Sequence, residues 1–147
     1  MSNSAYRLKR DQLSRQLHVS TEGIRLEKAA SNPFHTRVQS SGTKLQVRSL
    51  NEVIAVHAQG QIEVEGMTTY GDLTDPLARN CMPMMVAQLK SITIGGAVSG
   101  IESTSFRYGP AHETVKPMEV LLADGETIEC SPHNEQAELF FVIPKSR

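Results

Sequence analysis

The sequence predicts an α+β fold in which short strands pair mostly with their neighbours along the chain. A helical pattern opens the chain, short alternating apolar and polar segments follow, and a second helical pattern stands among them. Turn signals at Gly60 and at Asp124-Gly125 each separate two such segments, as in a β-hairpin. Strands and helices do not alternate regularly, so a doubly wound parallel sheet is not expected.

The first predicted element is an amphipathic helix over residues 6–19. Tyr6, Leu13 and Leu17 share one face, and charged residues occupy the opposite face. Thr21-Glu22-Gly23 ends this pattern. We therefore expect residues 1–23 to form an N-terminal helical segment.

Short extended segments make up most of the remaining elements. They are predicted at residues 24–27, 44–47, 53–56, 62–65, 115–123 and 126–130, with a buried extended run at 82–86. The stretch Lys28–Arg37 is expected to be irregular, because Asn32-Pro33 is a turn signal.

Two further helices are predicted. The first begins after a cap at Thr68 or Thr69 and runs toward Leu77, with Pro76 expected to bend or shorten it. The second is a short helix beginning at Glu135 and reaching Phe141.

Length, composition and charge exclude several classes of protein. The 147 residues suffice for one domain, and 39% hydrophobic with 21% charged residues is typical of a globular chain. The formal net charge of −1 gives no basic excess for a nucleic-acid partner. No apolar run is long enough for a membrane span, and the start of the chain does not resemble a signal peptide. We therefore expect a cytoplasmic protein with Cys81 and Cys130 as reduced thiols.

The side chains that commonly carry catalysis form no recognisable motif. The five histidines are His18, His35, His57, His112 and His133. None lies three or four residues from another, so a metal site is not expected. The nucleophile motif GxSxG is also absent.

The segment TIGGAVSG, Thr93 to Gly100, is the most suggestive part of the chain. Its paired glycines let a ligand approach the backbone, and converging N–H groups at a helix start can bind phosphate. The same glycines fit a tight turn in a β-rich domain. The pattern is neither GxGxxG nor Walker A, so both interpretations remain open.

Four stretches resemble one known family. They are IEVEGMTTYGDL from Ile62, MPM from Met82, QLKSITIGGAV from Gln88 and IESTSFRYG from Ile101. The sequence resembles the FAD-linked oxidoreductases with a PCMH-type (vanillyl-alcohol-oxidase type) FAD-binding domain, nearest to the delta-24 sterol reductase-like flavoproteins. The resemblance extends from Ile24 to Phe141.

The resemblance implies two small mixed α/β subdomains with FAD between them. It places the FAD pyrophosphate on the segment Thr93–Ser103, with the amides of Ile94, Gly95 and Gly96 closest. The residues implied in this segment are Thr93, Ile94, Gly95, Gly96, Ala97, Val98, Ser99, Gly100, Ile101, Glu102 and Ser103. A loop of the other subdomain contributes Lys28, Ser31 and Asn32. Because the flavin supplies the redox chemistry, no catalytic side chain and no metal ligand are assigned.

The sequence departs from the family pattern in three places. The glycine segment is two residues shorter between Gly100 and Ile101, and Leu77–Cys81 is one residue shorter and lacks a glycine. The chain also ends at Arg147, where the family continues into closing strands and a substrate-binding cap. We therefore expect residues 24–147 to be a C-terminally truncated FAD-binding domain with an incomplete second subdomain.

Two hypotheses about function follow from the resemblance. In the first, the chain binds FAD as the N-terminal part of a flavin-dependent oxidoreductase, and its independent activity is doubtful because the cap is missing. In the second, it is a non-enzymatic remnant that acts through self-association at an unpaired sheet edge. The expected partners are thus FAD and a second copy of the chain, and neither nucleic acid nor a membrane.

Overall fold

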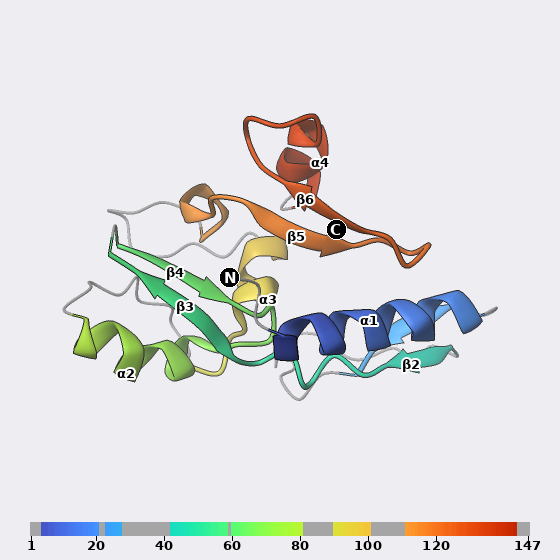
Figure 1. The fold of residues 1–147 in the computed structure, drawn as a ribbon, viewed down its shortest axis with the longest axis horizontal. Coiled ribbons are helices and arrows are strands. Elements are labelled where there is room, and N and C mark those ends of the chain that lie inside the picture. Colours follow the sequence, from blue (N-terminus) through green and yellow to red (C-terminus); the bar gives the residue numbers. More distant parts are fainter. Residues whose placement is uncertain are drawn as a thin grey trace.

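The computed structural model describes residues 4–20, 23–27, 42–58, 60–80, 90–100 and 111–143 (Figure 1). The fold is α+β, as the sequence predicts. In chain order the elements are α1 (Ser4–Val19), β1 (Ile24–Leu26), β2 (Thr43–Leu45), β3 (Val53–His57), β4 (Gln61–Val64), α2 (Tyr70–Arg79), α3 (Ile94–Ser99), the 3₁₀ helix η1 (Ala111–Thr114), β5 (Met118–Leu121), β6 (Thr127–Cys130) and α4 (Ala137–Val142).

The strands form three two-stranded sheets. Strands β1 and β2 are parallel, whereas β3 with β4 and β5 with β6 are antiparallel hairpins. Gly60 and Gly125 have φ angles of 76° and 85°, the left-handed conformation that glycine adopts without strain. Both predicted hairpins are therefore confirmed, with a glycine in each turn.

Helix α1 confirms the predicted amphipathic helix and packs into the main hydrophobic core. Its Leu13 and Leu17 are buried together with Leu45 and Val47 of the β2 region. Leu121 at the end of β5 packs against the same cluster. Figure 1 shows α1 lying alongside β2 and below the β5–β6 hairpin. The helix thus belongs to the core and is not a free arm.

Helix α2 begins at a capping box. Thr69 is the N-cap and accepts a hydrogen bond from the Asp72 N–H, while the Asp72 carboxylate accepts from the Thr69 N–H. Pro76 was predicted to bend or shorten this helix, and because the helix continues to Arg79, the proline does not shorten it. Leu77 directly after the proline is buried, and this packing outweighs the hydrogen bond that proline cannot donate.

Helix α3 packs against α2 in a second, smaller core. Tyr70 of α2 and Ala97 of α3 are buried together, with Ile92 and Ile94 against them. Figure 1 shows α3 between the β3–β4 hairpin and β5. The short predicted helix near the C-terminus is confirmed as α4, whereas η1 was not predicted.

Two predicted segments, Lys28–Arg37 and residues 82–86, lie outside the described residues. Within the described ranges, no helix is both long enough and apolar enough to cross a membrane.

Candidate functional site

The site is built around the start of α3. Thr93, with extended backbone, is the N-cap of this helix, and its Oγ1 accepts a hydrogen bond from the Gly96 N–H at 3.2 Å. The Thr93 carbonyl accepts from the Ala97 N–H at 2.9 Å. Thr93 is 7% exposed, so this cap is buried. Threonine at an N-cap fixes where the helix begins.

The start of α3 is tied to the start of α2. Thr69 and Thr93, the two N-cap residues, form an antiparallel β-bridge. On one side of the bridge, the Tyr70 N–H donates to the Ile92 carbonyl and the Gly71 N–H donates to the Lys90 carbonyl. Two helices distant in sequence therefore begin side by side.

The turn after β4 holds the first residues of α3. The Gly95 N–H donates to the Gly66 carbonyl and the Ile94 N–H to the Thr68 carbonyl, each at 2.8 Å. A β-carbon on Gly95 would lie 2.8 Å from the Gly66 oxygen, closer than real β-carbons approach. Gly95 is thus required for the contact between two backbone segments.

The first amide groups of α3 are hydrogen-bonded within the protein. The amides of Ile94, Gly95 and Gly96 were expected to donate to a pyrophosphate, but all three already donate within the protein. The first turn of α3 is therefore held by the turn after β4 and by the Thr93 cap. The contact of these amides with a pyrophosphate stays a prediction.

The remaining expected residues fall into two groups. Ala97 is buried, Val98 is half-buried, and Ser99 donates through Oγ to the Gly95 carbonyl at 2.8 Å. Gly100 follows as the C-cap of α3 with φ of −99°, so its own backbone is not left-handed. The others lie outside the described residues: Ile101, Glu102, Ser103, Lys28, Ser31 and Asn32.

The loop that carries Lys28 leaves from the carboxyl end of a parallel strand pair. Ile24, Arg25 and Leu26 pair with Thr43, Lys44 and Leu45, and the Glu27 N–H still donates to the Leu45 carbonyl at 2.8 Å. Loops at the carboxyl ends of parallel strands are a common place for ligands to bind.

Neither of two cavities in the structure includes the glycine segment. One, of about 360 Å³, is lined by apolar residues such as Leu13, Leu45 and Leu121, and the other, of about 510 Å³, borders α1 and β2. Among the described residues, no group of three or more His, Cys, Asp or Glu side chains could hold a metal ion. The described residues near α3 therefore offer a ligand backbone groups and hydroxyl groups.

Sequence reasoning missed the partner of the glycine segment. The turn Glu65–Thr68 supplies the acceptors for α3, and both Glu65 and Thr68 are buried. The signal was present in the stretch EVEGMTT, where a glycine and two threonines follow a strand.

Comparison with known proteins identifies the family. A family model described as an FAD binding domain matches residues 22–131. The Delta(24)-sterol reductase of Pisum sativum is 36% identical over 87 residues, which cover 57% of this chain and 15% of that protein. The Homo sapiens Delta(24)-sterol reductase is 33% identical over 102 residues, covering 67% of this chain and 20% of that protein. Cytokinin dehydrogenase 3 of Oryza sativa subsp. japonica is 29% identical over 129 residues, which cover 79% of this chain and 24% of that protein.

These matches define a nucleotide-cofactor-binding domain of flavoproteins. The chain belongs to the family of FAD-binding domains of the PCMH type, and its cofactor is FAD. It spans between 15% and 24% of the length of these three relatives.

The described residues show how the glycine segment is held in place. The close approach at Gly95 fixes α3 on the turn after β4, and the chain leaves α3 at Gly100 toward the second half of the glycine segment. The FAD-binding match includes both this segment and the loop after β1.

Proposed function

We propose that this chain binds FAD as the N-terminal part of a flavin-dependent oxidoreductase resembling the Delta(24)-sterol reductases. The family match over residues 22–131 carries this proposal. The 36% identity to a protein of that name favours this branch of flavoproteins. In this proposal the flavin supplies the redox chemistry, and residues of this chain bind and orient it.

The proposed site lies between two small mixed α/β subdomains. The segment Thr93–Ser103 lies at the FAD pyrophosphate. Its first part, Thr93–Ser99, acts as the scaffold, since its leading amides are bonded within the protein. The contacts with phosphate oxygens come from residues 100–103, where Ile101 and Ser103 offer N–H groups and Ser103 a hydroxyl group.

The loop after β1 supplies the second set of contacts. Lys28 provides a positive charge for the pyrophosphate, and Ser31 and Asn32 provide neutral donors. The loop follows the carboxyl end of a parallel strand, which supports this assignment.

Titration calorimetry with FAD and with riboflavin tests the role of the pyrophosphate. We expect FAD to bind with one site per chain and riboflavin, which lacks the diphosphate, to bind at least about tenfold more weakly. Lys28→Met should weaken FAD binding and leave riboflavin binding unchanged. Equal affinity for the two ligands would exclude a pyrophosphate site in this chain.

An alternative function is self-association of a non-enzymatic domain. Strand β1 carries exposed Ile24 and Leu26, and within the described residues it pairs only with β2. An apolar strand with an open edge is a template for a second chain. Sedimentation of the wild-type chain and of Leu26→Lys tests this alternative: it requires a dimer that the substitution converts to monomer, and a wild-type monomer rules it out.

A further inference from the structure

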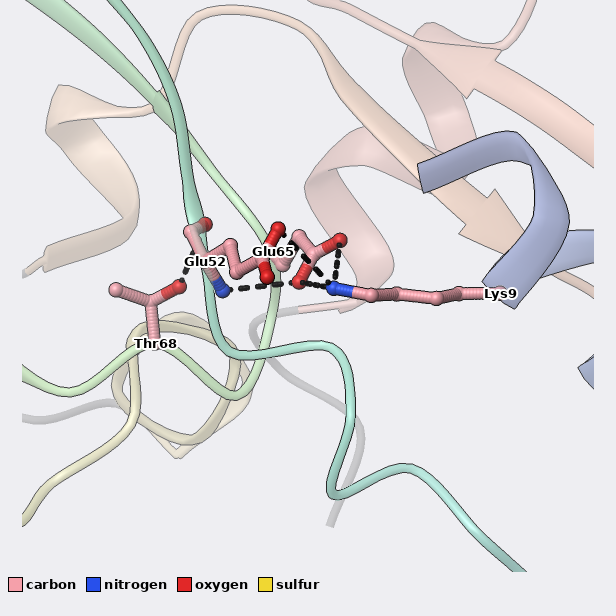
Figure 2. A network of polar contacts seen from close by, with 4 residues as sticks. All are labelled: Lys9, Glu52, Glu65 and Thr68. Carbon is pink, nitrogen blue, oxygen red and sulfur yellow. Dashed lines mark hydrogen bonds and ion pairs between the residues drawn. The ribbon is translucent and has the colours of Figure 1, made fainter. Parts of the chain in front are cut away.

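A buried ion pair connects α1 to the turn after β4. Lys9 of α1 reaches the Glu65 carboxylate, with Nζ 3.0 Å from Oε1 and 2.9 Å from Oε2 (Figure 2). The Glu65 side chain is only 1% exposed, and Lys9 also lies 3.3 Å from Glu52 Oε2. Desolvation of Lys9 opposes its charged form, but its hydrogen bonds and attraction to Glu65 and Glu52 outweigh this effect. They hold the pKa of Lys9 above its ordinary value.

The carboxylate of Glu65 has a second anchor in the same turn. Its Oε2 accepts the backbone N–H of Glu52 at 2.9 Å, and the Glu65 N–H donates to the Glu52 carbonyl at 3.0 Å. The fully buried Thr68 donates through Oγ1 to that same carbonyl at 3.0 Å. Figure 2 shows these four residues as one continuous network. The turn Glu65–Thr68 is therefore fixed at both ends.

This turn is the one that holds α3. The Gly66 and Thr68 carbonyls accept the N–H groups of Gly95 and Ile94. Each step from Lys9 to α3 is a direct contact: Lys9 to Glu65, Glu65 through the turn, and the turn to Gly95. A shift of the turn must move or weaken the start of α3, because these bonds are short and the backbones are in close contact at Gly95.

Helix α1 lies outside the residues that match the FAD-binding family. It also has a separate attachment to the β5–β6 hairpin, where Ser14 donates through Oγ to the Gly125 carbonyl at 2.7 Å. The effects of removing the Lys9–Glu65 contact and the Ser14–Gly125 contact can therefore be compared. Loss of the Ser14 contact loosens α1 without touching the turn, whereas loss of Lys9 leaves a buried carboxylate without its cation inside the turn.

We propose that Lys9 and Glu65 are positioning residues for the cofactor segment, so that α1 is a functional part of the FAD-binding unit. The proposal rests on the proposed function for its link to FAD. Its first step, control of α3 by the ion pair, concerns the FAD-free chain and is tested separately.

Hydrogen exchange of the FAD-free protein tests the first step. Removing one partner of a buried ion pair is strongly destabilising, so Lys9→Met should speed exchange of the Ile94 and Gly95 amides by at least about tenfold. Ser14→Ala, the matched control, removes the hydrogen bond to the Gly125 carbonyl and should leave exchange of the Ile94 and Gly95 amides unchanged. The proposal is overturned if the Ile94 and Gly95 amides exchange at the wild-type rate in a folded Lys9→Met chain. It is also overturned if Lys9→Met and Ser14→Ala change the exchange of these two amides equally.

Glu65→Gln is a second test of the ion pair, for use if Lys9→Met does not fold. This variant leaves no uncompensated buried charge, because Lys9 retains Glu52, and the amide oxygen can still accept the Glu52 N–H. We expect a smaller acceleration of exchange at the same two amides, and no change there contradicts the proposal.

FAD titration of the same variants tests the second step. The variant with the faster exchange at Ile94 and Gly95 should also bind FAD more weakly. Lys9→Met should therefore lose more affinity than Glu65→Gln, and Ser14→Ala should bind FAD with wild-type affinity. Faster exchange with unchanged FAD affinity overturns the positioning role but leaves the proposed function intact. A wild-type chain that does not bind FAD overturns the proposed function, and with it the positioning role, whatever the exchange data show.

Discussion

Gly95 and Gly66 meet backbone to backbone. The Gly95 N–H donates to the Gly66 carbonyl at 2.8 Å, and a β-carbon on Gly95 would lie at the same distance from that oxygen. The reverse is not true, since a β-carbon on Gly66 would meet none of the described residues within 4 Å. The requirement for glycine is therefore one-sided, although both residues share one hydrogen bond.

Alanine substitutions at these two positions should have unequal effects. Gly95→Ala forces α3 away from the turn, and we expect it to lower the free energy of unfolding by about 1–3 kcal/mol, as overpacking does. Gly66→Ala should change it by no more than about 0.5–1 kcal/mol. Urea unfolding followed by circular dichroism measures both. Equal losses would show that the close contact does not constrain α3.

The cap at Thr93 should matter through its hydroxyl group. Thr93→Val keeps the shape of the side chain but removes the acceptor of the Gly96 N–H, so we expect a loss of about 1 kcal/mol in unfolding free energy. Thr93→Ser retains the oxygen and should lose less. If valine and serine proved equally stable in thermal unfolding, the oxygen would have no part in the cap.

The two hairpin glycines offer another matched pair. Both have positive φ, but a β-carbon on Gly60 would be in open space, whereas one on Gly125 would lie 2.2 Å from His18 Cε1. Gly60→Ala should cost about 1–2 kcal/mol from backbone strain alone. Gly125→Ala should cost more, because the His18 side chain must also move. A smaller loss at Gly125 than at Gly60 would contradict this packing of α1 on the hairpin.

Tyr6 should make the protein sensitive to alkaline pH. Burial raises the pKa of Tyr6, and the hydrogen bond to Glu119 and the charge of that carboxylate raise it further, while Arg10 lowers it. As the pH rises past about 10, the unfolded chain loses this proton before the folded chain does, so stability falls. Lys9, whose pKa is also raised, adds to the fall in the same direction.

Tyr6→Phe isolates the contribution of the tyrosine. Because the hydrogen bond to Glu119 is missing, the free energy of unfolding of this variant should be about 1 kcal/mol lower at neutral pH. Above about pH 10 its free energy of unfolding should fall less steeply than that of the wild type. Urea midpoints measured across this range compare the two proteins. Parallel curves for wild type and variant would show that Tyr6 keeps its ordinary titration in the folded state.

The elements that are defined by local pattern could be predicted from the sequence. The hairpin at Asp124-Gly125 needs only a turn residue that accepts positive φ and two flanking strands. The same holds for α1, whose apolar face is visible in its spacing. The continuation of α2 past Pro76 was not predicted, because the burial of Leu77 is a tertiary effect that local pattern does not contain.

The candidate site could be predicted only in part. The glycine segment was recognised, and its amides were predicted to contact a ligand. In the structure the Ile94 and Gly95 amides donate to the turn after β4 and the Gly96 amide to Thr93. The stretch EVEGMTT indicates a turn after a strand, but local pattern does not show that this turn faces Gly95, because the pairing of Thr69 with Thr93 brings the two together. The structural role of Gly95 depends on a backbone contact with Gly66, which is distant in the sequence.

The most direct test of the central claim is the response of assigned backbone amides to FAD, measured by NMR on the 147-residue chain. We predict saturable shifts at Gly100–Ser103 and in the Lys28–Asn32 loop, with riboflavin causing much smaller changes there. The Ile94 and Gly95 amides should stay protected from exchange throughout. FAD binding that leaves both segments unshifted, or no binding at all, would contradict the account.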